Sequence, residues 1–296
     1  MLGRVIATGN FDGLHQGHRR ILDIVNAEAT SRGLEPLAVT YEPHTRHFLG
    51  TPGVPALLTP PLEKKDLFHD FGMPLEQLSF TPQLAGMSGL EYVRDIVIAK
   101  YRAQVWVFGP NHRFGAGGKG SIEEVSQAFP GLKIIQLDSL FLESGLVSSS
   151  RIRDALEEGN LDLANGLLGR SYCLEGLVVP GDARGRQIGF PTANILVEPF
   201  KQLPKFGVYA GWAKFEGEEH LAVVNIGLRP TFDGQNPSVE VHLPEWAGDL
   251  YGKRLQMKLD LFLRGEMRFS GVDSLTSQIT CDVQRAQSVL NQRSAH

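Results

Sequence analysis

The sequence predicts two domains: an α/β domain with a parallel sheet, then a mainly antiparallel β-barrel that ends in a helix. Three observations carry this prediction. The first half alternates short apolar runs with helical patterns, the second half shows strict two-residue alternation, and 296 residues are enough for two hydrophobic cores. The pattern changes near Gly166–Ser171, so we expect domains at residues 1–168 and 169–296.

The elements of the first half are short strands separated by helical patterns. Helix 18–32 is the best defined, because its apolar residues recur on one face and Gly33 supplies a stop signal. Strands that alternate with helices indicate a parallel sheet. The predicted strands are Val5–Thr8, Leu37–Tyr41, Val105–Phe108 and Lys133–Leu137, and the predicted helices are His18–Arg32, Leu62–Phe71 and Gly89–Tyr101.

The second half has the two-residue period of strands that are buried on one side. The clearest run is Arg254–Leu263, and Gly207–Phe215 and Val239–Leu243 are similar. Turn signals such as EGEE and DGQN separate the runs. A helical pattern at Ser274–Asn291 follows. In the clearest run, alternation places five side chains on one face: Leu255, Met257, Leu259, Leu261 and Leu263.

The overall composition excludes several classes of protein. A formal net charge of −4 argues against a broad nucleic-acid footprint. Cys173 and Cys281 form no CxxC pair, which speaks against a disulfide framework. No apolar run resembles a signal peptide or reaches membrane-spanning length. We therefore expect a cytoplasmic enzyme or binding protein that binds neither nucleic acid nor membranes; composition leaves its protein partners unknown.

The stretch GNFDGLHQGH follows the first predicted strand and opens the first predicted helix. Ligands of open parallel sheets bind at this edge, and a helix N-terminus suits phosphate. Gly9 and Gly13 would permit a tight turn, and Gly17 would permit close approach of a ligand. His15 and His18 are three residues apart, so both would face the same ligand. Two alternatives stay open at this point: half of a metal site, or surface histidines without a role.

Three further polar stretches follow the other predicted strands: YEPH, FGPNHRFG and LVSSSRIR. Together with GNFDGLHQGH they resemble the adenylyltransferase half of bifunctional riboflavin kinase/FAD synthetases, which is similar to the Rossmann-like HxGH nucleotidylyltransferases. The resemblance implies that His15 and His18 hold ATP phosphates and that Asn111 lies on the flavin side. It further implies a phosphate-binding segment with Ser149, Ser150 and catalytic Arg153, and additional binding residues Gly9, Asn10 and Phe11.

Two positions depart from the family pattern. His112 stands where the family usually has an aromatic residue, and Thr45 stands where it usually has a proline. Neither departure removes a phosphate-binding group. The run GAGGKGS at 115–121 is not a P-loop, since Lys119 is followed by glycine and Arg113 occupies the position of the leading glycine.

The stretch GDARGRQIGFPTANI in the second half is too rich in glycine and arginine for a simple strand. Thr192 and Asn194 are two residues apart, which in an extended segment places both side chains on one face. Their oxygens suit Mg²⁺, a hard cation that accompanies nucleotide phosphates. An ordinary Asx turn is the structural alternative.

The stretches GFPTAN, NIGLRPTF, EVHL and DLYGKR resemble the riboflavin kinase half of the same family, in the family order. The resemblance implies that Thr192 and Asn194 contact Mg²⁺ and ATP and that Glu240 is the general base. A loop at 181–186 would cover the ATP phosphates. Four more binding residues are implied: Gly181, Arg184, Gly185 and Arg229.

The resemblance as a whole implies riboflavin, FMN, FAD and ATP as substrates and products. Riboflavin and ATP would give FMN and ADP in the C-terminal barrel, and FMN and ATP would give FAD and pyrophosphate in the N-terminal domain. Two other readings compete. One module could be degenerate, with His112 making the adenylyltransferase the candidate. Alternatively, the barrel could bind flavin or single-stranded nucleic acid without catalysis, although the acidic balance disfavours nucleic acid.

Overall fold

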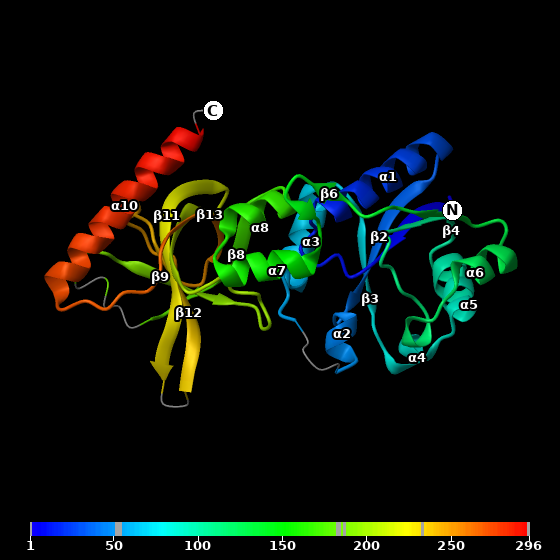
Figure 1. The fold of residues 1–296 in the computed structure, drawn as a ribbon, viewed down its shortest axis with the longest axis horizontal. Coiled ribbons are helices and arrows are strands. Elements are labelled where there is room, and N and C mark those ends of the chain that lie inside the picture. Colours follow the sequence, from blue (N-terminus) through cyan, green and yellow to red (C-terminus); the bar gives the residue numbers. More distant parts are fainter. Residues whose placement is uncertain (1, 51–54, 182–184, 186–187, 232–233, 295–296) are drawn as a thin grey trace. The chain divides into compact units, whose positions relative to one another are not determined.

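The computed structural model describes residues 2–50, 55–181, 185, 188–231 and 234–294, and it divides the chain into two compact units (Figure 1). Residues 1–149 form the first unit and residues 150–296 the second.

The first unit is built on a five-stranded parallel sheet of order β3-β2-β1-β4-β5. All four predicted strands are present. The edge strand β3 was not predicted, because only Leu78 of its five residues is buried and its sequence lacks an apolar run. The chain runs outward from β1 in both directions, so the carboxyl end of β1 lies at the point where the strand order reverses. The strands are β1 (Arg4–Thr8), β2 (Glu35–Glu42), β3 (Leu75–Ser79), β4 (Ala103–Phe108) and β5 (Lys133–Gln136).

Helices cover both faces of this sheet. One core contains Val5, Ala7, Val105 and Val107 of the sheet together with α1 (Gln16–Arg32) and α3 (Pro61–Asp70). The opposite core contains Ile6, Trp106 and Phe108 together with the π-helix η1 (Tyr92–Lys100) and α6 (Ile122–Ala128). The remaining elements are α2 (Thr45–Phe48), α4 (Pro82–Gly86), α5 (Gly89–Glu91), η2 (Ala116–Gly118), β6 (Phe141–Leu142) and β7 (Gly145–Leu146).

Helix α1 confirms the sequence pattern closely. Its buried side chains are Ile21, Leu22, Val25 and Ala29, which are the predicted apolar face. Gly33 ends the helix in the left-handed conformation, with a φ of 65°. The helix begins two residues earlier than predicted, because His15 acts as its N-cap.

The second unit contains a closed six-stranded antiparallel barrel of order β10-β11-β12-β9-β8-β13. The predicted fold class, a parallel α/β domain plus an antiparallel barrel with a terminal helix, is thus confirmed (Figure 1). The strands are β8 (Tyr172–Val179), β9 (Thr192–Val197), β10 (Gly207–Phe215), β11 (Glu218–Thr231), β12 (Gly234–His242) and β13 (Arg254–Arg264), and the helices are α7 (Ser149–Glu158), α8 (Leu161–Leu168) and α10 (Val272–Ser294).

The prediction that five alternating residues of β13 share one face is wrong. The pairing with β10 shifts register between Leu259 and Leu261, which is a β-bulge. Leu255, Met257 and Leu259 are completely buried. Beyond the bulge, Leu261 and Leu263 instead belong to a separate apolar cluster with Ala286 and Leu290 of α10. The bulge thus supplies the surface on which the terminal helix packs.

Helix α8 is tied to the barrel strands. Asn165 Nδ2 donates to the carbonyl of Leu259 at 2.9 Å, and Asn165 Oδ1 accepts from the N–H of Tyr172 at 2.8 Å. Contacts within the chain therefore group residues 150–168 with the barrel. The functional boundary after residue 168 remains a prediction.

Candidate active sites

The turn that follows β1 has an unusual backbone conformation. Phe11, Gly13 and Leu14 have positive φ angles of 47°, 89° and 38°. Left-handed conformations are unfavourable for residues with side chains, so such a turn persists only where its surroundings hold it. Buried Asp12 accepts from the N–H of Thr59 at 3.0 Å, and the Thr59 hydroxyl accepts from the N–H of Gly13 at 2.9 Å. The turn is therefore fixed before any ligand binds.

The turn brings His15 and His18 together at the start of α1. Their rings stack with centroids 3.7 Å apart and planes inclined by 13°. His15 Nδ1 accepts from the backbone N–H of His18 at 3.3 Å. A neutral His15 then carries its proton on Nε2, so that side of the ring is a hydrogen-bond donor. The two histidines form one stacked unit beside the positive end of a helix dipole.

Gly17 makes this stack possible. A Cβ at position 17 would lie 3.2 Å from Cε1 and Nδ1 of the His15 ring. The missing side chain therefore leaves room for the histidine, in addition to the predicted room for a ligand.

Asn10 joins the turn to two other elements. Its Nδ2 donates to the Thr45 hydroxyl at 3.0 Å, a bond that a proline at position 45 could not make. Its carbonyl accepts from Lys64 Nζ at 2.7 Å and from the Thr40 hydroxyl at 3.2 Å. The Thr45 departure from the family pattern thus adds a contact to the turn.

His112 lies beside the last residue of β1. Its Nε2 is 3.1 Å from the hydroxyl of Thr8, which also accepts from Trp106 Nε1 at 2.9 Å. The ring stacks on Phe108, with centroids 4.9 Å apart. Burial lowers the pKa of His112 to about 4, so the ring is neutral at pH 7. His112 keeps the aromatic packing expected at this position and adds a polar contact to β1.

The other predicted residues of the adenylyltransferase come from two further segments, the loop after β4 and helix α7. Ser149, at the start of α7, donates to the carbonyl of Asp12 at 2.7 Å and so touches the turn directly. Asn111 is exposed in the loop after β4. Ser150 is exposed, and Arg153 is buried one turn further along α7.

In the barrel, the predicted kinase residues form a row across neighbouring strands. Asn194 of β9 lies directly opposite Glu240 of β12, which lies opposite Asn225 of β11. Thr192 is opposite His242, whose Nδ1 bonds to the carbonyl of Pro191 at 2.8 Å. Directly paired antiparallel residues face the same side, so register brings the Asn194 and Glu240 side chains together.

Two glycines of the predicted phosphate loop lie against the same row. A Cβ at Gly181 would approach Asn194 Nδ2 to 2.0 Å, and one at Gly185 would lie 3.5 Å from the Thr192 hydroxyl. Arg184 lies outside the described residues. Arg229 belongs to β11, and only its backbone is described.

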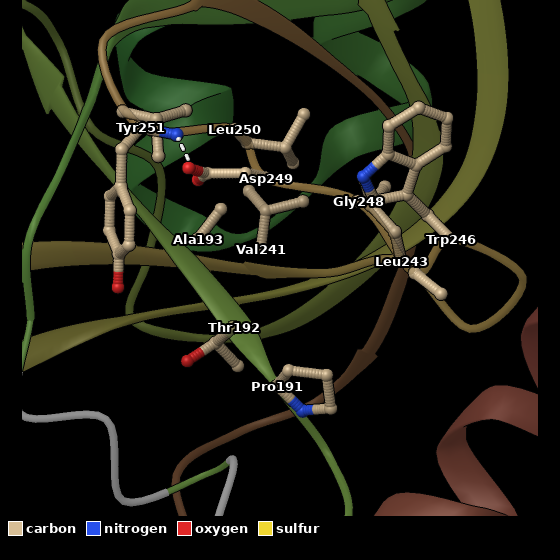
Figure 2. A pocket seen from close by; sticks show the side chains of 12 residues that line it. Pro191, Thr192, Ala193, Val241, Leu243, Trp246, Gly248, Asp249, Leu250 and Tyr251 are labelled. Atoms are coloured by element: carbon tan, nitrogen blue, oxygen red, sulfur yellow. Dashed lines mark hydrogen bonds between the residues drawn. The ribbon is translucent and has the colours of Figure 1, made fainter.

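A cavity of about 570 Å³ adjoins Thr192 (Figure 2). Figure 2 shows Pro191 and Thr192 on one side and the 246–251 segment on the other. The walls are mainly apolar, with Val178, Ala193, Val241 and Leu250. Its size and lining are typical of a small-molecule site.

Two polar groups of these regions, the Lys64 ammonium and the Trp246 indole N–H, were not predicted from the sequence. Lys64 occupies a core position of α3, four residues before buried Phe68, where the helical pattern calls for an apolar residue. Trp246 lines the cavity, and its Nε1 is buried without a hydrogen-bond partner among the described residues. The polar residue at an apolar helical position was a usable signal for Lys64. The sequence holds no comparable signal for Trp246.

Two features are absent from the described residues. No three His, Cys, Asp or Glu side chains gather as a metal site, so His15 and His18 acquire no third ligand there. No helix in the described part of the chain is long and apolar enough to cross a membrane.

Known families match both units. The FAD synthetase family model matches residues 2–151, and the riboflavin kinase family model matches residues 168–290. The bifunctional riboflavin kinase/FMN adenylyltransferase of Escherichia coli K12 is 37% identical over 287 residues, which cover 95% of this chain and 90% of that protein. The enzyme of the same description from Bacillus subtilis is 35% identical over 288 residues, which cover 95% and 91%.

A solved structure resembles this chain over most of its length. The crystal structure described as a macrolide-efflux protein from Streptococcus pneumoniae has a TM-score of 0.86 and 28% identity, and the match covers 96% of this chain and 94% of that chain.

The first unit has a parallel sheet with a histidine pair beyond the carboxyl end of β1, and the second has a barrel with Asn194 paired to Glu240. These features define the class of protein as a nucleotide-dependent transferase with two modules. With both family models matched, the chain belongs to the bifunctional riboflavin kinase/FMN adenylyltransferase family. It phosphorylates riboflavin to FMN and adenylylates FMN to FAD, with ATP as co-substrate of both reactions.

Proposed function

We propose that adenylyl transfer takes place at the 9–18 turn and phosphoryl transfer at the row formed by Asn194 and Glu240. One observation carries this division. Each unit holds its own set of phosphate-directed groups, a stacked histidine pair at a helix N-terminus in the first and an oxygen-rich row beside an apolar cavity in the second.

Adenylyl transfer requires neutralisation of charge on a leaving group. An oxygen of the FMN phosphate attacks the α-phosphorus of ATP, and pyrophosphate leaves with increased negative charge. The Nε2–H of His15, His18 and the first N–H groups of α1 would stabilise that charge. Ser149, Ser150 and Arg153 would contact the phosphates as well. Gly9, Asn10 and Phe11 would shape the nucleotide side, and Asn111 the flavin side.

Phosphoryl transfer to riboflavin requires a base for the 5′-hydroxyl of the ribityl chain. Glu240 would accept that proton as the γ-phosphoryl group arrives. Asn194 lies directly opposite Glu240 in the ladder, so the base and the phosphate-directed group share one face. Gly181 and Gly185, with Arg184 and Arg229, would cover the phosphates.

The donor groups of this row fit Mg²⁺. Thr192 and Asn194 offer neutral oxygens, and the absence of a Cβ at Gly181 lets the Asn194 amide lie directly against the backbone of the predicted phosphate loop. Mg²⁺ prefers oxygen ligands and commonly uses few protein ligands together with substrate phosphates. Thr192 and Asn194 would hold the ion, which would supply charge neutralisation for the transferred phosphoryl group.

The cavity beside Thr192 suits the base and ribose of ATP. Its apolar walls would cover the purine, and the Nε1 of Trp246, which has no partner within the described part of the chain, is a donor for a ring acceptor. Because Thr192 lines the cavity and also belongs to the proposed metal and phosphate group, a nucleotide bound there would have its phosphates near Thr192.

The histidine assignment is tested by His15→Ala and His18→Ala. Loss of a phosphate-directed donor typically lowers the rate about a hundredfold, so FAD formation from supplied FMN should fall by about that factor. Riboflavin phosphorylation by the same preparation should be unchanged. His69→Ala, which removes an exposed histidine of the same unit, is the matched control. Equal loss of both activities would contradict the division between units.

The base assignment is tested by Glu240→Gln, which keeps shape but loses proton acceptance. A general base contributes about a hundredfold to ten-thousandfold, and FMN production should fall within that range. Adenylylation of supplied FMN should hardly change. Glu245→Gln removes an exposed carboxylate close by in sequence and is the control. Wild-type phosphorylation by Glu240→Gln would remove Glu240 from the mechanism.

A further inference from the structure

Lys64 is a buried cation that neither proposed reaction uses. It is 4% exposed, whereas its neighbour Lys65 on α3 is exposed. Lysine is rarely buried unless its ammonium is paired, because removing the charge from water is unfavourable. Burial lowers the pKa of Lys64, and the carboxylates of Asp12 and Glu42 oppose that shift.

The Lys64 ammonium is directed at one backbone carbonyl. Its Nζ donates to the Asn10 carbonyl at 2.7 Å and to the Thr40 hydroxyl at 3.4 Å, and that hydroxyl donates to the same carbonyl at 3.2 Å. Two buried side chains from different elements therefore converge on a single peptide group. Such convergence fixes the orientation of that peptide.

The peptide held in this way directly precedes the strained part of the turn. Phe11, the next residue, has a φ of 47°, and its ring contacts the His18 ring with centroids 5.4 Å apart. The same ring contacts Phe68 of α3, with centroids 5.6 Å apart. Helix α3 thus contacts the turn at two points: Lys64 donates to the Asn10 carbonyl, and Phe68 packs against the Phe11 ring. The Phe11 ring therefore connects Phe68 of α3 with the His18 ring.

We propose that Lys64 is a positioning residue of the adenylyltransferase: by holding the Asn10 carbonyl, it keeps the turn in the conformation that presents His15 and His18. This inference rests on the proposed role of the histidine pair. Because Lys64 acts on the geometry of groups that stabilise the departing charge, its removal reduces kcat of FMN adenylylation more than it raises KM for ATP.

The test compares Lys64→Met with Lys65→Met in the full-length chain. Small displacements of catalytic groups reduce rates about tenfold to a hundredfold, so kcat of adenylylation should fall by that factor in Lys64→Met, with KM for ATP within about threefold of wild type. Riboflavin phosphorylation and the urea unfolding profile should match those of Lys65→Met. A kcat for Lys64→Met equal to that of Lys65→Met overturns the proposal, as does a change confined to KM.

Thr40→Val provides a second measurement if Lys64→Met fails to fold. It removes the other donor to the Asn10 carbonyl with little change in volume and none in charge. Its adenylylation kcat should fall in the same direction, and a wild-type kcat overturns positioning through this carbonyl. His15→Ala in the same assay distinguishes failure of the proposed histidine site from failure of the Lys64 inference. If His15→Ala is fully active, the proposed histidine site fails; if only Lys64→Met and Thr40→Val are fully active, the Lys64 inference alone fails.

Discussion

His112 should make the first unit less stable in mildly acidic solution. Its ring packs against Phe108 and Trp106, and its Nε2 lies 3.1 Å from the Thr8 hydroxyl. That hydroxyl also accepts from Trp106 Nε1 at 2.9 Å. Protonation of the ring places a charge among these aromatic side chains, away from water. Burial accordingly lowers the His112 pKa to about 4 from its usual 6.5.

The sign and size of the effect follow from these two pKa values. Between pH 6.5 and pH 4, the unfolded chain binds a proton at His112 that the folded chain does not, so stability falls as the pH is lowered through this window. One pKa unit corresponds to about 1.4 kcal/mol. The loss from this group is therefore about 2 kcal/mol at pH 5 and reaches about 3 kcal/mol at pH 4. Above pH 6.5 the group has no effect.

The free energy of unfolding is measured by urea titration at pH 7 and at pH 5. Unfolding is followed by hydrogen–deuterium exchange of peptides from β1 and β4, so that the signal comes from the first unit alone. His112→Phe keeps an aromatic ring and cannot titrate, and His69→Ala is the control for an exposed histidine. The wild type should lose about 2 kcal/mol more than His112→Phe between the two pH values, and His69→Ala should behave as the wild type does. Equal losses in the wild type and His112→Phe would refute the reasoning.

Two further predictions concern the second unit. In Gly181→Ala the new Cβ would lie 2.0 Å from the Asn194 amide, so the rate of riboflavin phosphorylation should fall about tenfold or more while FMN adenylylation is unchanged. The control is Gly265→Ala, where the new Cβ meets open space and both rates should equal those of the wild type. A wild-type rate of phosphorylation for Gly181→Ala would contradict the close approach. A fragment of residues 150–296 should phosphorylate riboflavin without making FAD. Because α8 packs on the barrel, this fragment should melt at a higher temperature than a fragment of residues 169–296. Equal melting temperatures would place the domain boundary after residue 168.

The sequence predicted the elements whose pattern reflects a single packing surface. Helix α1 is one such case, since its apolar stripe at positions 21–29 is buried as expected. The strand β13 is the contrasting case. Its alternation is regular through Leu263, yet a bulge transfers Leu261 and Leu263 to a second apolar cluster under α10. The strand buries apolar side chains on one face before the bulge and on the other face after it. Alternation alone cannot show where one strand of a pair gains an extra residue.

The same contrast holds for the candidate sites, where the sequence predicted the central residues but not the contacts that support them. Motif spacing predicted His15, His18 and Asn194, the family resemblance added Glu240, and the structure brings the members of each pair together. The supporting contacts depend on segments distant in sequence and were not predictable. Lys64 reaches Asn10 across fifty-four positions, and Trp106 reaches Thr8 across ninety-eight. Such contacts arise from the order of the strands in the sheet, which local patterns do not encode.

The two sites obtain their precision by different physical means. The kinase row is an ordinary antiparallel ladder, in which the pairing of Asn194 with Glu240 follows from strand register. The adenylyltransferase turn has left-handed residues and is held by buried polar groups, above all Lys64 and Asp12. Burial lowers the pKa of Lys64, so raising the pH removes the charged donor that holds the turn, whereas the pairing of Asn194 with Glu240 persists while the strands stay paired. Raising the pH should consequently impair FAD synthesis before FMN synthesis, and an equal decline of both rates would contradict this account.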